Sequence, residues 1–302
     1  MGRIEAVCIS EKKGTVKKDV GQCVVIEDFG LKDDAHAGSI RQVSLLSFET
    51  VEDFKSRTGD KAGILPGAFG ENLLVSGIDP EVLSPGTILR TGDILLEITQ
   101  IGKECHSGCE IMKRTGECIM PKQGVFARVL RGGTVKTGDE ITRPFTAAVI
   151  TSSDRSFNGE REDMSGPLIK ETLEKEGYHV REMILLPDDE ERMMNELIRI
   201  SDEECTDVIF TTGGTGFSAR DRVPEATIRA ADRMAPGIAE AVRAYSMQIT
   251  PRAMLSRAAS VIRGKTLIIN LPGSPKAVNE CLGFLVPNLA HGILILRGEA
   301  DG

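Results

Sequence analysis

The stretch Thr212-Gly213-Gly214-Thr215-Gly216 follows the apolar run 208–210, and Asp221 comes five residues after it. An apolar run that ends in glycines predicts a strand, followed by a turn whose backbone N–H groups are not covered by side chains. Such a loop can wrap an anion, although an ordinary turn between a strand and a helix explains the loop alone equally well. The stretch therefore predicts a strand, loop and helix in that order, and leaves the ligand open.

The same order repeats through the second half of the chain. Apolar runs predict strands at 147–150, 180–186, 208–210 and 266–271. Helical periodicity predicts helices at 167–176, 190–200, 224–231, 237–248 and 275–285. Strands that alternate with helices favour a parallel sheet covered on both faces. We therefore predict a C-terminal three-layer α/β domain with a mostly parallel sheet.

Polar or glycine-rich segments follow all four predicted strands. They are Ser152-Ser153-Asp154, Pro187-Asp188-Asp189, the 212–216 loop and Asn270-Leu271-Pro272-Gly273-Ser274. Ligands of open parallel sheets bind outside the carboxyl ends of the strands, so we expect these segments to line one crevice. Asp221 lies just before a helix that Pro224 can begin. A carboxylate beside bound phosphates suits a Mg²⁺ ion that bridges protein and phosphate oxygens.

Other polar residues near this edge have two interpretations each. Asp188 is as well explained by a cap at the start of the next helix as by a role in the site. Ser256, Arg257 and Lys276 are candidates for hydroxyl and cationic contacts to phosphate, although exposed Arg and Lys side chains are usually only solvated.

Residues 1–143 have a different pattern. Short β-rich runs at 42–46 and 94–99 are separated by turn pairs such as Pro85-Gly86 and Gly138-Asp139. This spacing favours a β-barrel, because closing the sheet removes its unpaired edges. We predict a β-barrel domain at 1–143 and the α/β domain at 144–302, joined by a very short linker at Pro144.

The first half also holds Cys105-His106-Ser107-Gly108-Cys109, and Cys118 follows nine residues later. The spacing matches no common zinc pattern. Lys103 favours a reactive Cys105 thiolate, whereas a buried structural cysteine is the commoner case. His36 and Arg41 are candidates for contact with an anionic ligand, although a lone histidine is more often only hydrogen-bonded within the fold.

Composition narrows the class of protein. The chain has 302 residues, a net charge of −8 and a pI near 5.3, which argues against a nucleic-acid-binding face. No apolar run approaches the roughly 18 residues that span a bilayer, and the N-terminus lacks a signal-peptide core. We therefore expect a cytoplasmic protein with no membrane partner and with reduced cysteines.

Seven motifs in the second half occur in the order of a known family. They are Ser152-Ser153-Asp154-Arg155, Asp163-Met164-Ser165-Gly166, Pro187-Asp188, 212–216, Arg220-Asp221 with Pro224-Glu225-Ala226-Thr227, Leu255-Ser256-Arg257 and 270–276. This half closely resembles the molybdopterin adenylyltransferases. The resemblance implies a nucleotidyltransferase, usually a homotrimer, that transfers AMP from Mg-ATP to molybdopterin and releases pyrophosphate.

The resemblance also assigns residues. Its two functional aspartates map onto Asp188 and Asp221, as catalytic and Mg²⁺-binding groups. The positions matched to cofactor and nucleotide binding are Ser152, Ser153, Asp154, Thr212, Gly213, Gly214, Thr215, Gly216, Ser256, Arg257, Asn270, Pro272, Gly273, Ser274 and Lys276.

The first half resembles the MOSC domain, a β-barrel named for the C-terminal domain of molybdenum cofactor sulfurases. The matching residues are 30–38, 41–45, 69–73, 102–106, 124–129 and Gly138-Asp139. The resemblance implies binding of molybdenum cofactor and sulfur carriage at Cys105, with sulfur-donor or molybdenum-insertion proteins as partners. The leading hypothesis is a fused enzyme; the alternatives are a non-catalytic cofactor carrier and a nucleotide hydrolase of the competence-protein type.

Overall fold

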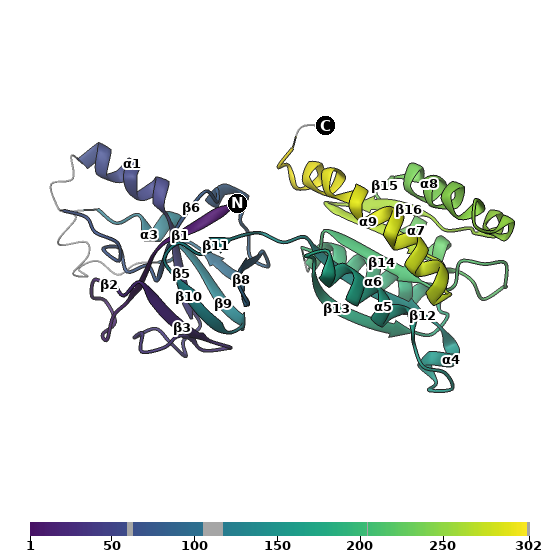
Figure 1. Ribbon diagram of the computed structural model, residues 1–302, viewed down its shortest axis with the longest axis horizontal. Coiled ribbons are helices and arrows are strands. Elements are labelled where there is room, and N and C mark those ends of the chain that lie inside the picture. The colour runs from purple at the N-terminus through teal and green to yellow at the C-terminus, as the bar shows by residue number, and fades with distance from the viewer. Residues whose placement is uncertain (59–62, 105–116, 204, 301–302) are drawn as a thin grey trace. The chain divides into compact units, whose positions relative to one another are not determined.

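A computed structural model describes residues 1–58, 63–104, 117–203 and 205–300 (Figure 1). The chain forms two compact units, Met1–Pro144 and Phe145–Gly302. Each unit has its own sheets and its own buried apolar clusters.

Unit 1 is built mainly from strands. They are β1 (Gly2–Ile9), β2 (Lys18–Asp19), β3 (Gln22–Ile26), β4 (Gly30–Leu31), β5 (Val43–Ser47), β6 (Leu73–Ser76), β7 (Ile88–Thr91), β8 (Ile94–Ile101), β9 (Val125–Arg131), β10 (Gly133–Lys136) and β11 (Glu140–Ile141). The helices are α1 (Phe48–Thr58), α3 (Met120–Gln123) and a 3₁₀ turn at Pro80–Val82. One sheet has the order β11-β1-β6-β5-β9-β8-β7, with β2 paired to β1, and a second has the order β10-β3-β4.

The large sheet of unit 1 is buried on both faces. In β1, Ile4 and Val7 belong to one apolar cluster and Ala6 and Cys8 to the other, which also holds Phe54 of α1. The register shift between Ile4 and Ala6 bends the strand and changes which face of the sheet the following side chains point to.

The expected β-barrel is confirmed only as a curled sheet, a half-barrel. An isolated bridge joins Arg90 of β7 to Thr142, the residue that follows β11. Two residues later Pro144 has no N–H with which to extend that pairing.

Unit 2 alternates strands with helices. Its strands are β12 (Thr146–Ser152), β13 (His179–Leu186), β14 (Val208–Thr212), β15 (Arg233–Met234), β16 (Ser260–Arg263) and β17 (Thr266–Leu271). Its helices are α4 (Asp154–Phe157), α5 (Ser165–Lys175), α6 (Glu190–Glu203), α7 (Val223–Ala230), α8 (Pro236–Met247), α9 (Pro275–Arg297) and a 3₁₀ turn at Pro251–Leu255.

The sheet of unit 2 is mixed, so the expectation of a mostly parallel sheet is confirmed only in part. Its order is β13-β12-β14-β17-β16-β15, and the first four strands are parallel. β16 and β15 run antiparallel to their neighbours. Only Gly264 and Lys265 separate β16 from β17, and so short a connection can only make a hairpin.

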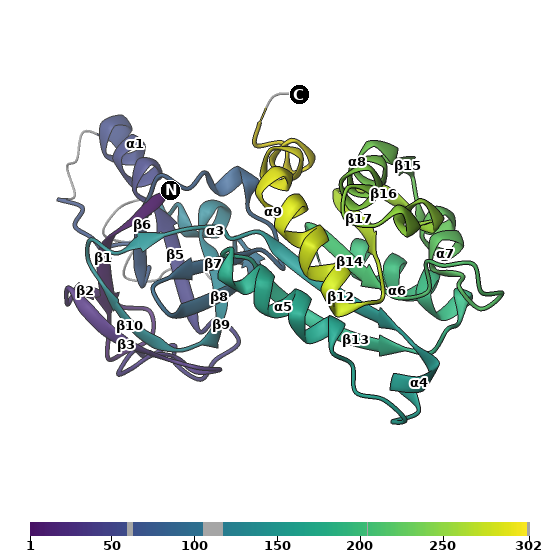
Figure 2. The ribbon, with the colours of Figure 1, turned by 45° about the vertical axis from the view of Figure 1, so that its right-hand side comes forward.

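Helices cover both faces of this sheet. Val149 and Phe210 face a cluster with Ile169 of α5 and Leu282 of α9, to which α8 also contributes. Alternate strand residues such as Ile150 face a second cluster, formed with α6 and α7. Figures 1 and 2 show α5 and α9 side by side on one face. The loops that follow β12, β14 and β17 meet at the carboxyl ends of these strands.

Of the described helices, only α9 is long and apolar enough by composition to cross a membrane. The expectation that no segment reaches this length was therefore too strict. Its residues Val278, Leu282, Leu289 and Ile293 pack in the core of unit 2, and a core helix of a soluble protein passes the same test.

Candidate functional site

A pocket of about 360 Å³ lies where three parallel strands of unit 2 end. Residues after β12, β14 and β17 line it, together with residues 161–165 at the start of α5. Six residues expected in the site line this pocket: Ser152, Ser153, Thr212, Gly213, Gly273 and Ser274. Segments that lie far apart in the sequence thus form one polar cavity, as the strand order requires.

Glycine at 213 and 273 lets the three loops touch through their backbones. Gly213 has a φ of 89°, and a Cβ there would overlap the carbonyl oxygen of Ser152. A Cβ on Gly273 would lie 3.2 Å from Cα of Gly213. Thr212 Oγ1 also donates to the carbonyl oxygen of Pro272 at 2.7 Å. The glycines therefore allow close packing of the loops.

Asp188 is tied to the loop after β12. Its carboxylate accepts hydrogen bonds from Ser152 Oγ at 2.8 Å and from the Asp154 N–H at 3.3 Å, and its own N–H donates to Asp154 at 3.0 Å. The cap at the start of α6 is Asp189, which accepts from the Arg192 N–H at 2.9 Å. Asp188 is thus not used as the helix cap.

Asp221 lies at the end of the glycine-rich segment. Its Oδ2 accepts from the Ser218 N–H at 2.8 Å and would be 2.9 Å from a Cβ on Gly216. Arg220, next to it, pairs with the carboxylate of Asp154. The loops that carry Asp221 and Asp188 are therefore linked through Asp154.

Several other residues expected to contact ligands make hydrogen bonds within the protein. Asn270 is buried; its amide nitrogen donates to Thr211 and Thr227, and its oxygen accepts from Ala259. Ser153 and Ser274 cap the starts of α4 and α9, and Ser256 accepts from the Ala258 N–H. Thr215 is buried, Gly214 accepts from the Val223 N–H, and Arg257 donates to the Gly216 and Asp221 carbonyls. Lys276 is exposed, 4.0 Å from Glu280.

Sequence reasoning missed Asp163 as a candidate. This pocket residue accepts from Thr151 Oγ1 at 2.7 Å and from the N–H groups of Ser165 and Gly166 at 3.0 and 3.1 Å. Ser165 Oγ then donates to the carbonyl oxygen of Gly273. An aspartate two residues before a Ser-Gly pair at the start of a helix is a capping pattern, and that signal was available in the sequence.

The donor set of this site fits Mg²⁺. Asp188 and Asp221 are not among the residues that line the pocket, but Asp188 accepts a hydrogen bond from the lining residue Ser152. Both would supply carboxylate oxygens, which are hard ligands. Among the residues that the structure describes, no group of three or more His, Cys, Asp and Glu side chains forms a metal site. Mg²⁺ commonly takes one or two protein carboxylates and completes its shell with phosphate oxygens and water, so the residues fit an ion that arrives with a nucleotide.

Unit 1 contains a small cationic cavity of about 80 Å³, lined in part by His36, Arg41, Lys103 and Phe126. The Arg41 guanidinium and the Lys103 ammonium lie 5.2 and 5.7 Å from the centre of the Phe126 ring. His36 Nδ1 lies 3.5 Å from the carboxylate of Asp34. The cavity suits an anion. Cys105, His106 and Cys109 lie outside the described residues.

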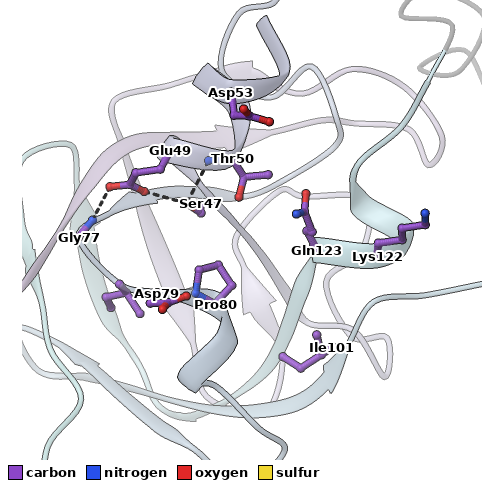
Figure 3. A pocket seen from close by; sticks show the side chains of 11 residues that line it. Ser47, Glu49, Thr50, Asp53, Gly77, Asp79, Pro80, Ile101, Lys122 and Gln123 are labelled. Carbon is purple, nitrogen blue, oxygen red and sulfur yellow. Dashed lines mark hydrogen bonds between the residues drawn. The ribbon is translucent and has the colours of Figure 1, made fainter. Parts of the chain in front are cut away.

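A larger cavity in unit 1, about 750 Å³, lies between α1, the turn after β6 and α3 (Figure 3). Glu49 there already accepts from the Gly77 N–H at 2.8 Å and from Ser47 Oγ at 2.7 Å, as Figure 3 shows. Asp53 pairs with Arg57 at 2.8 Å. Size alone does not make this cavity a functional site, because these two carboxylates are engaged within α1 and its flanking turns.

Two family models match this chain, one in each of its two units. Residues 148–291 match the family model of a probable molybdopterin binding domain, and residues 32–142 match that of the MOSC domain. A molybdopterin adenylyltransferase of Helicobacter pylori is 39% identical over 153 residues, which are 50% of this chain and 87% of that protein. The chain belongs to the molybdopterin adenylyltransferase family.

Other known proteins align over a similar length. The molybdopterin adenylyltransferase of Escherichia coli is 38% identical over 152 residues, 50% of this chain and 77% of that protein. The solved structure of the molybdopterin biosynthesis enzyme MoaB from Thermus thermophilus is 42% identical. It aligns with 51% of this chain and 97% of its own, with a TM-score of 0.49.

Proposed function

We propose that residues 145–302 adenylylate molybdopterin in molybdenum cofactor biosynthesis. A phosphate oxygen of molybdopterin attacks the α-phosphorus of ATP, the bond from that phosphorus to the oxygen of the β-phosphate breaks, and pyrophosphate leaves. The observation that carries the proposal is the convergence of the loops after β12, β14 and β17 on one polar pocket, in a chain of this family.

The residues present suit this chemistry because phosphoryl-type transfer depends on positioning and charge neutralisation. The N–H groups of 213–216 would hold phosphate oxygens. Asp221 and Asp188 would hold Mg²⁺, which when bound neutralises phosphate charge. The hydroxyls of the pocket, such as that of Ser152, would orient the substrates. The transfer needs no nucleophile from the protein.

The direct test mixes the full chain with molybdopterin and Mg-ATP and measures pyrophosphate and adenylylated pterin. We expect both products in equal amounts. Tight binding of the pterin without either product would instead support a non-catalytic carrier.

We expect Asp221→Asn to lower turnover by about 100-fold or more, because the carboxylate charge is lost while a hydrogen-bond acceptor remains. Thermal unfolding should be unchanged. The control is Glu171→Gln in an exposed pair with Lys175 on α5, which should leave turnover unchanged. Unchanged turnover in Asp221→Asn would exclude its proposed role.

We propose that unit 1 binds molybdenum cofactor at the cationic cavity and carries sulfur on Cys105. The sulfane sulfur of a persulfide donor would pass to the Cys105 thiolate, and the donor thiol would leave. Mass spectrometry after exposure to such a donor should find a persulfide on Cys105. Equal labelling of all seven cysteines, or no adduct at Cys105, would contradict this.

The family resemblance further leads us to propose a homotrimer that acts in the cytoplasm, with sulfur-donor or molybdenum-insertion proteins as partners. Light scattering should then give about three times the 32.6 kDa of one chain. A mass of one chain would contradict the trimer.

A further inference from the structure

Arg257 contacts the segment that carries Asp221 at four points. Its backbone N–H donates to the Thr215 carbonyl at 3.0 Å, and its Nε donates to the Gly216 carbonyl at 2.7 Å. One terminal nitrogen donates to Glu225 at 2.5 Å, and the other donates to the Asp221 carbonyl. The contacts therefore fall on both sides of the Asp221 carboxylate, from the glycine loop to α7.

These contacts need a guanidinium. Arginine offers five N–H donors in one rigid plane, and three of them here reach three acceptors that are spread from Gly216 to Glu225. Lysine carries a compact ammonium on a flexible stem and cannot reach three acceptors in this arrangement. The Arg257 side chain is one-third exposed, so the contacts are partly shielded from water.

Glu225 completes the arrangement. Burial acts to raise the pKa of its carboxyl, but the hydrogen bonds from Arg257 and from its own backbone N–H, together with the charges of Arg257 and Arg222, hold that pKa below its usual range. Glu225 is therefore charged when Arg257 binds it. Since Glu225 lies in the first turn of α7, this pair anchors Arg257 to the helix that follows Asp221.

We propose that Arg257 is a positioning residue, which fixes the Asp221 carboxylate for Mg²⁺ through the Gly216 and Asp221 carbonyls and does not itself bind phosphate. The inference rests on the proposed function. It assigns to Arg257 a role that differs from the phosphate contact expected from the sequence.

The test uses the full chain and the variants Arg257→Ala, Arg257→Lys and Glu225→Gln. Hydrogen exchange of residues 213–222 is measured without ligands, and Mn²⁺ binding in the presence of ATP is measured by electron paramagnetic resonance. For Arg257→Ala we expect at least about tenfold faster exchange in this segment and at least about tenfold weaker Mn²⁺ binding. Arg257→Lys should not restore either property, and Glu225→Gln should show a smaller change in the same direction.

Two further measurements separate positioning from phosphate binding. In the adenylylation assay, raising Mg²⁺ should restore most of the rate of Arg257→Ala but none of that of Asp221→Asn. Added guanidinium ion should also partly restore the rate of Arg257→Ala. Two results together would overturn the inference. Arg257→Lys would behave like the wild type, and Arg257→Ala would show only a raised KM for ATP, with an unchanged Mg²⁺ requirement.

The control is Arg229→Ala. Arg229 lies on α7, as Glu225 does, but it pairs with Glu190 and Glu191 of α6 and not with the Gly216 and Asp221 carbonyls, so exchange and Mn²⁺ binding should stay near wild-type values. Hydrogen exchange and Mn²⁺ binding can both be measured without turnover. A wild-type protein that binds Mn-ATP but forms no product would therefore overturn the proposed function and still leave the effect of Arg257 measurable.

Discussion

Gly213 packs closely against the backbone of Ser152. Alanine there would have both a positive φ and a Cβ in overlap with the Ser152 carbonyl. We expect Gly213→Ala to destabilise unit 2 by about 2 kcal/mol or more, because neither the backbone angle nor the neighbouring backbone can adjust freely. Product formation should be lost as the two loops separate. Denaturant unfolding and the adenylylation assay measure the two effects.

Gly264 provides a matched control for that substitution. It also has a positive φ, 55°, but nothing lies within 4 Å of a Cβ added there. Gly264→Ala should therefore cost only about 1 kcal/mol and keep full activity. Equal losses in both variants would show that the contact with Ser152 has no special importance.

Glu71 should make the stability of unit 1 depend on pH. Burial raises the pKa of its carboxyl from 4.5 to about 7, although the Gly67 and Phe69 N–H groups hydrogen-bond to it. The folded state binds this proton more tightly than the unfolded chain, so the stabilisation is complete below about pH 4.5 and is lost as pH rises through about 7. We expect hydrogen-exchange protection of residues 63–76, corrected for intrinsic rates, to fall at least about tenfold from pH 5 to 8.

Glu71→Gln is the control, and its protection should be nearly flat across this range. Asp34, the other strongly shifted carboxyl nearby, has a lowered pKa and does not titrate between pH 5 and 8. A wild-type protein whose protection does not change with pH would show that Glu71 stays charged.

The sequence located residues but not their partners. The positions of Gly213 and Asp188 were predictable because each follows an apolar run at the edge where ligands bind, and that of Asp221 because it lies just before a helix that Pro224 can begin. The roles of Asn270 and Arg257 were not, because their hydrogen-bond partners lie up to 59 residues away in the chain. Residue type alone does not tell a group that holds a loop from one that holds a ligand.

At the scale of elements, a buried ion pair joins Arg297, the last residue of α9, to Asp207, which directly precedes β14. Arg297 donates to both carboxylate oxygens of Asp207 at 2.7 Å, and its guanidinium lies 4.9 Å from the centre of the Phe145 ring. We expect Arg297→Met to destabilise unit 2 by about 3–5 kcal/mol, because it leaves the buried Asp207 charge uncompensated. Urea unfolding followed by tyrosine fluorescence reports on unit 2, since both tyrosines, Tyr178 and Tyr245, lie there.

Lys175→Ala is the comparison for that variant. Lys175 pairs with Glu171 on the exposed side of α5, where both side chains are in solvent. Exposed pairs contribute at most about 1 kcal/mol, so this change should barely shift the midpoint. Similar shifts for the two variants would mean that burial does not increase the contribution of the Arg297–Asp207 pair to the free energy of unfolding.

The four parallel strands were predicted to within about two residues at either end because apolar runs mark strands buried on both faces. The β15–β16 edge was missed, since two- and four-residue strands give too short a pattern. The C-terminal helix was predicted to end at 285, before Pro287, but α9 continues to Arg297. Leu289 and Ile293 extend its buried stripe beyond the proline, so tertiary packing outweighs the missing hydrogen bond.

At the scale of the whole molecule, each buried apolar cluster formed by the described residues belongs to a single unit. Two clusters belong to Met1–Pro144 and two to Phe145–Gly302. The pocket with Ser152 and Thr212, the Asp221 carboxylate and the Arg257 contacts all lie in the second unit. Each unit thus has what an independent domain needs, a core of its own.

We therefore expect residues 145–302, produced alone, to fold cooperatively and to adenylylate molybdopterin with a kcat/KM within about threefold of the full chain. The Arg297–Asp207 pair and the Phe145 ring that it contacts are retained in this fragment, so its first strand keeps its anchor. Steady-state kinetics and urea unfolding of the fragment and the full chain provide the comparison. A fragment that folds but loses more than about tenfold in kcat/KM would show that unit 1 takes part in the transfer; an unfolded fragment would show that the units are not separate domains.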